Sequence, residues 1–123
     1  MFTAKIIRGA GRGKTLGYPT LNLALEDIPD GLEEGIYAVR ARVGESETLL
    51  PAVMHYGARP VFEDTRSCEI HILGKIPNSQ FPIPNILTVE VVQWLREVRD
   101  FESEESLKEQ IAKDIAKAQT LLH

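Results

Sequence analysis

Short apolar runs separated by turn residues fill the first three quarters of the chain. Five runs have the length and composition of β-strands: residues 3–7, 35–43, 48–56, 67–73 and 86–95. In RARV and CEIHIL, polar and apolar residues alternate, as they do in a sheet with one solvated side. Clusters of Gly, Pro, Asp and Asn separate the runs. Several strands with no helix between them predict an antiparallel sandwich or barrel, and we favour a small closed barrel.

The hydrophobic period changes near the end of the chain. The apolar residues that recur there at helical spacing are Leu107, Ile111, Ile115, Ala118 and Leu122. Ser103 precedes them as a candidate N-cap, acidic residues follow it and lysines come later, which matches the helix dipole. This pattern predicts a helix over about 103–122 that packs on a barrel of about 1–101, within a single domain of 1–123. The alternative is that the stripe binds a partner helix.

Composition narrows the class of protein. The 123 residues are 43% hydrophobic and 26% charged, which is typical of one soluble globular domain. The single cysteine, Cys68, cannot form an internal disulfide and favours a reducing compartment. No apolar run approaches the roughly 18 residues of a membrane span, and the start lacks the apolar region of a signal peptide. We therefore expect a cytoplasmic protein, a monomer, without a membrane partner.

Charge argues against nucleic acid and points to a local anion site. The net charge is −4, whereas binding to nucleic acid depends on a basic surface. An oligonucleotide-binding barrel is also disfavoured by the single tryptophan, because such barrels stack bases on aromatic residues. Locally, Arg8, Arg12 and Lys14 crowd together, with no acidic residue before Glu26. An anion is therefore expected near the start of the chain.

The stretch GAGRGKT, at 9–15, looks like a phosphate loop of the Walker A type but fails its spacing. Three residues rather than four separate Gly9 from Gly13, and Pro19 follows too soon for the helix that such a loop must open. A glycine-rich loop between strands remains. Alternate glycines at Gly9, Gly11 and Gly13 leave backbone N–H groups open for a phosphate, with Arg12 and Lys14 as rim charges. The alternative is a solvated hairpin without a ligand.

The next residues suggest a metal. Pro19 favours an extended backbone, so Thr20 and Asn22 project to the same side. A hydroxyl and an amide oxygen are hard ligands that Mg²⁺ accepts when nucleotide phosphates complete its shell. The alternative is that both side chains satisfy backbone groups in a turn.

Two further positions carry candidate chemistry. Alternation in CEIHIL places Glu69 and His71 on one face, opposite Cys68 and Ile70, so Glu69 is expected on a solvated face. On its position in the strand alone, Glu69 is more often an ordinary surface glutamate than a catalytic group. Trp94 is a candidate for stacking on an aromatic ligand or, alternatively, a core residue.

These motifs, in order, resemble the riboflavin kinase family. The resemblance rests on GAGRGKTLGYPTLNL at 9–23, GIYA at 35–38, GARP at 57–60, EIHIL at 69–73, and LREVRDF at 95–101 with the helix after it. It implies a mainly β fold, a six-stranded antiparallel closed Greek-key barrel with a C-terminal helix packed on it. It also implies Mg²⁺-dependent transfer of the γ-phosphate of ATP to the 5′-hydroxyl of riboflavin, giving FMN and ADP.

The resemblance also assigns residues. It implies that Glu69 takes the proton of the riboflavin hydroxyl, that Arg96 and the segment to Phe101 bind the flavin, and that Thr20 and Asn22 bind the metal. The residues that it assigns to the nucleotide are Gly9, Gly11, Arg12, Gly13, Lys14, Pro19, Thr20 and Asn22.

Three segments depart from the family pattern. The sequence reads HYG at 55–57 where the family usually has NIG, PVF at 60–62 where it has PTF, and a proline-rich stretch at 74–85 where it has an acidic segment. The departures favour an alternative function, a catalytically weak barrel that binds a flavin or nucleotide. Many bacterial relatives carry an additional adenylyltransferase domain, and both a stand-alone kinase and a domain of a larger enzyme are compatible with the sequence.

Overall fold

The computed structural model describes residues 1–7, 20–44, 47–58, 66–73, 86–98 and 103–122. Its elements are the strands β1 (Phe2–Ile7), β2 (Thr20–Leu23), β3 (Gly35–Val43), β4 (Leu50–Ala58), β5 (Arg66–Ile72) and β6 (Ile86–Arg96), the short 3-10 helix η2 (Leu25–Asp27) and the helix α1 (Glu104–Leu122). Four of the predicted strands agree with observed strands to within about a residue at each end, and β4 begins and ends two residues later than predicted.

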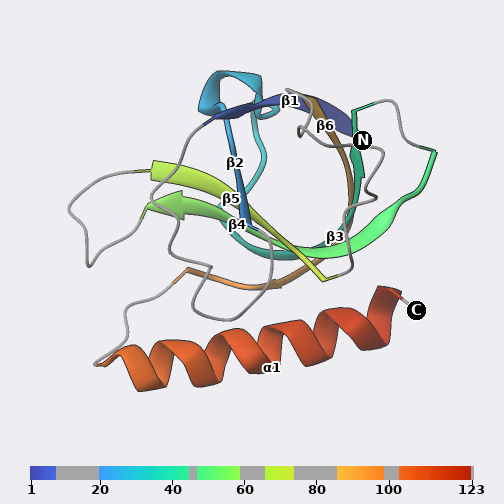
Figure 1. Ribbon diagram of the computed structural model, residues 1–123. Coiled ribbons are helices and arrows are strands. Elements are labelled where there is room, and N and C mark those ends of the chain that lie inside the picture. The colour runs from blue at the N-terminus through green and yellow to red at the C-terminus, as the bar shows by residue number, and fades with distance from the viewer. Residues whose placement is uncertain (8–19, 45–46, 59–65, 74–85, 99–102, 123) are drawn as a thin grey trace.

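The six strands form a closed barrel in the order β1-β2-β5-β4-β3-β6, with every neighbouring pair antiparallel (Figure 1). β3, β4 and β5 follow one another as neighbours, and β6 returns to lie beside β3, which is the Greek-key arrangement. The predicted fold is therefore confirmed. Closure gives each of the six described strands two partners, and these partners fix its register.

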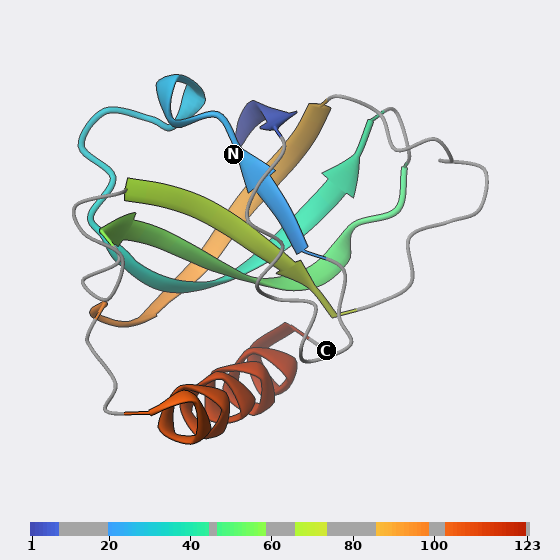
Figure 2. The same ribbon diagram turned by 60° about the vertical axis from the view of Figure 1, so that its left-hand side comes forward.

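The interior of the barrel is filled by one face of each strand. Its largest fully buried side chains are aliphatic or sulfur-containing: Leu23, Met54, Ile70, Ile72, Leu87, Val39, Val43, Val89 and Cys68. All of them belong to one hydrophobic cluster. Figure 2 shows the strands of the barrel from a second direction, with α1 lying along one side. The alternation seen in the sequence therefore reflects an inside and an outside of the barrel.

Part of the outside is also apolar and is covered by α1. A second cluster joins Ile36, Ala38, Val53 and Leu95 of the barrel to Ile115, Ala118 and Leu122 of the helix. The helix lies along one side of the barrel, on the side away from β1 (Figure 1). The predicted packing of the helix on the barrel is confirmed. Among the residues that the structure describes, no helix is long and apolar enough to cross a membrane.

The start of α1 generates a prediction about stability. The Ser103 hydroxyl oxygen accepts a hydrogen bond from the Ser106 backbone N–H at 3.2 Å, as an N-cap does. Replacing Ser103 with Ala should lower the free energy of unfolding by about 1 kcal/mol in urea denaturation, because that N–H loses its partner. Ser106→Ala keeps the backbone N–H and serves as the control. An unchanged urea midpoint for Ser103→Ala would show that the cap contributes nothing.

Burial of Cys68 generates a second prediction. The side chain is 1% exposed, and burial raises the pKa of the thiol from 9.0 to about 12. Native protein at pH 8 should therefore react with a thiol reagent far more slowly than protein unfolded in guanidinium. The unfolded thiol ionises at lower pH than the folded one, so this group should lower the free energy of unfolding as the pH rises above about 9. Rapid labelling of the native protein would contradict the prediction.

Candidate active site

A single row of residues crosses five strands of the barrel. The register pairs Asn22 of β2 with Glu69 of β5, Glu69 with His55 of β4, His55 with Ile36 of β3, and Ile36 with Arg96 of β6. Directly opposed residues of antiparallel strands carry their side chains on the same face. We call these five positions the site row. It places Asn22 beside Glu69 and puts Arg96 on the same barrel surface.

The site row lies on the outside of the barrel. On β5, Cys68 and Ile70 are buried in the interior cluster, so Glu69 between them faces outward. This arrangement confirms the predicted division of faces. The expectation of a solvated outer face is wrong, however, because Glu69 is only 3% exposed and His71 only 8% exposed. Glu69 is therefore not an ordinary surface glutamate, and burial shields its carboxylate from water.

Glu69 and Asn22 are the pair with the most evident chemistry. Opposed residues have Cβ atoms about 5 Å apart, so the carboxylate and the amide are near neighbours. Asn22 is held from both sides, by Ile7 of β1 and by Glu69 of β5, and its side chain is half-buried. A rigid strand thus places one polar group with access to solvent beside one shielded carboxylate. This arrangement suits a base next to a site for charged ligands.

The side-chain oxygen atoms at the β2 end of the site row suit a hard cation that takes few of its ligands from the protein. Thr20 lies one row further along β2, where it pairs with His71 of β5. In the described part of the chain no group of three or more His, Cys, Asp or Glu side chains is placed to hold a metal ion. Mg²⁺ in nucleotide sites usually takes one or two protein oxygens and completes its shell with phosphates and water. The amide oxygen of Asn22 and the residue type at Thr20 match that kind of site.

Several predicted site residues lie outside the described residues. They are Gly9, Gly11, Arg12, Gly13, Lys14, Pro19 and Phe101. Their assignments stay predictions from the sequence.

Arg96, at the other end of the site row, is bound to the helix. Its Nε donates to Oδ1 of Asp114 at 3.0 Å, and its NH2 group donates to Oδ2 at 2.8 Å. Asp114 is 5% exposed. Sequence reasoning missed Asp114, although one signal was present. Asp114 stands three residues after Ile111 and four before Ala118, on the apolar face of the helix, where a charge requires a buried partner.

His55 is the second residue that sequence reasoning left without a role. The sequence marks it only as a departure from the family pattern, whereas the register places it directly opposite Glu69. The pairing of β4 with β5 is not visible in the composition of either strand. No signal in the sequence therefore connects His55 with Glu69.

Trp94 lies near one end of the barrel rather than in the core. Its indole is 42% exposed, and its Nε1 donates to the carbonyl oxygen of Glu34 at 3.2 Å. The hydroxyl of Tyr37, paired with Trp94 in the register, donates to the carbonyl oxygen of Glu33. Burial, followed by the charge of Glu33, raises the pKa of Tyr37, which keeps it a neutral donor. The core interpretation of Trp94 is wrong, and stacking on a ligand stays a prediction.

Comparison with known proteins matches one family over nearly the whole chain. A family model described as "Flavokinase: Riboflavin kinase" matches residues 1–122. Riboflavin kinase of Homo sapiens is 34% identical, over 96% of this chain and 77% of its own length. Riboflavin kinase of Yarrowia lipolytica is 30% identical, over 93% of this chain and 76% of its own length. The bifunctional riboflavin kinase/FMN adenylyltransferase of Haemophilus influenzae is 29% identical, over 97% of this chain but 37% of its own length.

Two solved structures share the fold. Riboflavin kinase from Trypanosoma brucei aligns with a TM-score of 0.61 and 20% identity, covering 98% of this chain and 78% of that one. A protein titled macrolide-efflux protein, from Streptococcus pneumoniae, aligns with a TM-score of 0.76 and 23% identity, covering 96% of this chain and 38% of that one. Because both identities are low, at 20% and 23%, these two structures support the fold alone, which is the barrel with its C-terminal helix. With the family model matched over 1–122, the chain belongs to the riboflavin kinase family.

Proposed function

We propose that this chain transfers the γ-phosphate of ATP to the 5′-hydroxyl of riboflavin and releases FMN and ADP. Membership of the riboflavin kinase family supports this activity. The observation that carries the proposal is the pairing of Glu69 with Asn22 on the outer face of the barrel. It brings the candidate base beside the candidate ligand of a phosphate-bound metal, which are the two groups that phosphoryl transfer to an alcohol requires.

Glu69 is the general base in this proposal. Its carboxylate accepts the proton of the 5′-hydroxyl while the hydroxyl oxygen forms a bond to the γ-phosphorus. The bond between the γ-phosphorus and the oxygen that links it to the β-phosphate breaks, and that oxygen leaves with ADP. Because Glu69 is 3% exposed, water does not compete with the substrate hydroxyl for the carboxylate. The strand residues on either side of Glu69 restrict the movement of its carboxylate and orient it toward the substrate hydroxyl.

We propose Mg²⁺ as the metal, with Thr20 and Asn22 as its protein ligands. When bound, the ion would neutralise the negative charge that develops on the phosphates during transfer. Residues Gly9–Lys14 are proposed to surround the phosphates with backbone N–H groups, and Arg96 with Phe101 to bind the flavin. These assignments rest on the sequence motifs and on the resemblance. The placement of Asn22 opposite Glu69 supports the metal assignment.

The remaining properties are proposals of the same kind. We propose that residues 1–123 act as one catalytic domain, as a monomer, in the cytoplasm. The single buried cysteine supports a reducing compartment. The net charge of −4 supports a protein without a nucleic-acid partner.

Purified protein incubated with riboflavin, ATP and Mg²⁺ should form FMN, because the chain carries the candidate base Glu69 and the candidate metal ligands Thr20 and Asn22. The measurement is chromatographic separation with flavin fluorescence as the readout. Formation of FMN should stop when a chelator removes divalent metal, and should resume when Mg²⁺ is returned. Riboflavin binding without FMN formation would refute the kinase and favour the alternative function, a flavin-binding barrel.

Replacing Glu69 with Gln should lower kcat by about 10²–10⁴-fold, because the amide cannot accept the proton. Binding of ATP, measured by calorimetry, should persist in this variant. Glu90→Gln is the matched control, since it makes the same change on β6 and breaks a half-exposed pair with Arg40. An unchanged kcat in Glu69→Gln would exclude Glu69 as the base.

A further inference from the structure

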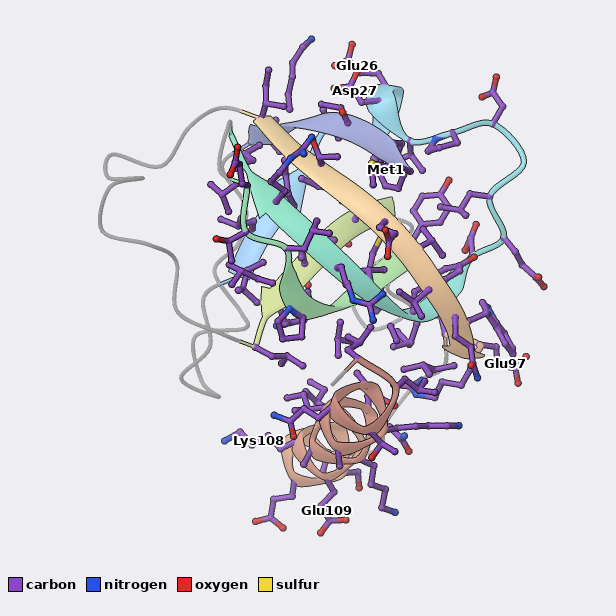
Figure 3. All side chains as sticks on the ribbon, turned by 90° about the vertical axis from the view of Figure 1, so that its right-hand side faces the viewer. Met1, Glu26, Asp27, Glu97, Lys108 and Glu109 are labelled. Carbon is purple, nitrogen blue, oxygen red and sulfur yellow. The ribbon has the colours of Figure 1, made fainter. Side chains whose placement is uncertain are left out.

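The guanidinium of Arg96 connects three parts of the molecule. Two of its nitrogens bind the carboxylate of Asp114 on α1, at 3.0 Å and 2.8 Å. The third nitrogen, NH1, donates to the carbonyl oxygen of Glu97 at 2.9 Å. Glu97 is the residue after β6 and lies at the end of that strand, on the side of the barrel near α1 (Figure 3). One side chain therefore ties the end of β6, the helix and the backbone that follows the strand.

The carboxylate that receives Arg96 is itself held in place. Gln110, one helical turn before Asp114, donates from Nε2 to Oδ1 of Asp114 at 3.1 Å. The side chain of Asp114 is 6% exposed and that of Arg96 is 18% exposed. A bidentate pair of this kind fixes the plane of the guanidinium as well as its position. The helix thereby orients Arg96.

A second ion pair, which joins β6 to β3 instead of to α1, provides a comparison. Arg40 of β3 contacts Glu90 of β6 through a single 2.9 Å contact, and their side chains are 32% and 36% exposed. Pairs at that exposure contribute little to stability, and they leave the partners free to exchange with water. The pair between Arg96 and Asp114 is bidentate, more buried and supported by Gln110. This arrangement holds the guanidinium of Arg96 in one position and one orientation.

We propose that Asp114 and Gln110 are positioning residues of the riboflavin site. They hold the guanidinium of Arg96, which is assigned to the flavin, and, through its bond to Glu97, the backbone at the end of β6. In this inference α1 belongs to the riboflavin site as well as covering the barrel. The inference rests on the proposed function and on the assignment of Arg96 to the flavin.

Asp114→Asn tests the proposal, because it keeps the size of the side chain and removes the charge that binds Arg96. We expect the Kd of riboflavin, measured by quenching of its fluorescence without nucleotide, to rise by about ten- to a hundredfold. The KM for riboflavin should rise in parallel, while the KM for ATP stays unchanged. Glu90→Gln is the matched control, and it should leave both constants at the wild-type values.

The competing explanation is that the pair only holds the helix on the barrel. Under that explanation Asp114→Asn lowers the midpoint of thermal unfolding but leaves the riboflavin Kd unchanged in the folded protein, and this result overturns the proposal. An equal rise in the KM for ATP also overturns it, because the effect is then not specific to the flavin.

A second variant, Gln110→Ala, allows the proposal to be tested even if Asp114→Asn does not fold. It removes the supporting contact to Asp114 and leaves the ion pair in place, so we expect a smaller rise in the riboflavin Kd and no change for ATP. If Asp114→Asn does not fold, an unchanged Kd in folded Gln110→Ala overturns the proposal. Because the Kd is measured without turnover, the test remains informative even if the wild-type protein binds riboflavin but forms no FMN.

Discussion

The closed register of the barrel is the constraint on which the site depends. In a β-sheet, a slip of one residue moves every side chain of a strand to the opposite face. Cys68 and Ile70 fill the interior, and that packing fixes β5 against both of its neighbours. The register therefore fixes which face of the barrel Glu69 occupies and which residues oppose it, namely Asn22 on β2 and His55 on β4. The geometry of the candidate site is thus set by the interior cluster, although Asn22, Glu69 and His55 lie outside that cluster.

The outer surface of the barrel adds a second constraint. Ile36 and Val53 face outward and are apolar, so they require a cover, which α1 supplies with Ile115 and Ala118. A helix placed by this packing brings Asp114 against the end of β6, where an arginine can neutralise it. The apolar contacts supply most of the free energy of docking, because hydrophobic burial is the dominant favourable term. The ion pair adds orientation, which apolar contacts alone do not provide.

The sequence predicted the elements of this fold better than their pairing. Alternation and turn residues located β3, β5 and β6 because those signals are local. The strand β2 has only four residues and was recognised as an extended segment rather than as a member of the sheet. The site row depends on which strands are neighbours, and that depends on contacts between residues far apart in the chain. The sequence therefore identified Asn22 and Glu69 as candidates without showing that they are opposed.

Burial was the other property that the sequence did not reveal. Alternation placed Glu69 outside the barrel, and the outside of a small barrel is normally solvated. The structure buries both Glu69 and His71 there, so the outer face at β5 is a desolvated polar region. Because the backbone register holds each position, the residue type at position 55 sets the chemical neighbour of Glu69 without moving this candidate base. His55 is that neighbour here, and the pairing of β2 with β5 keeps the Glu69 carboxylate opposite Asn22. A fold that fixes positions through its core thus leaves its outer row open to chemical variation.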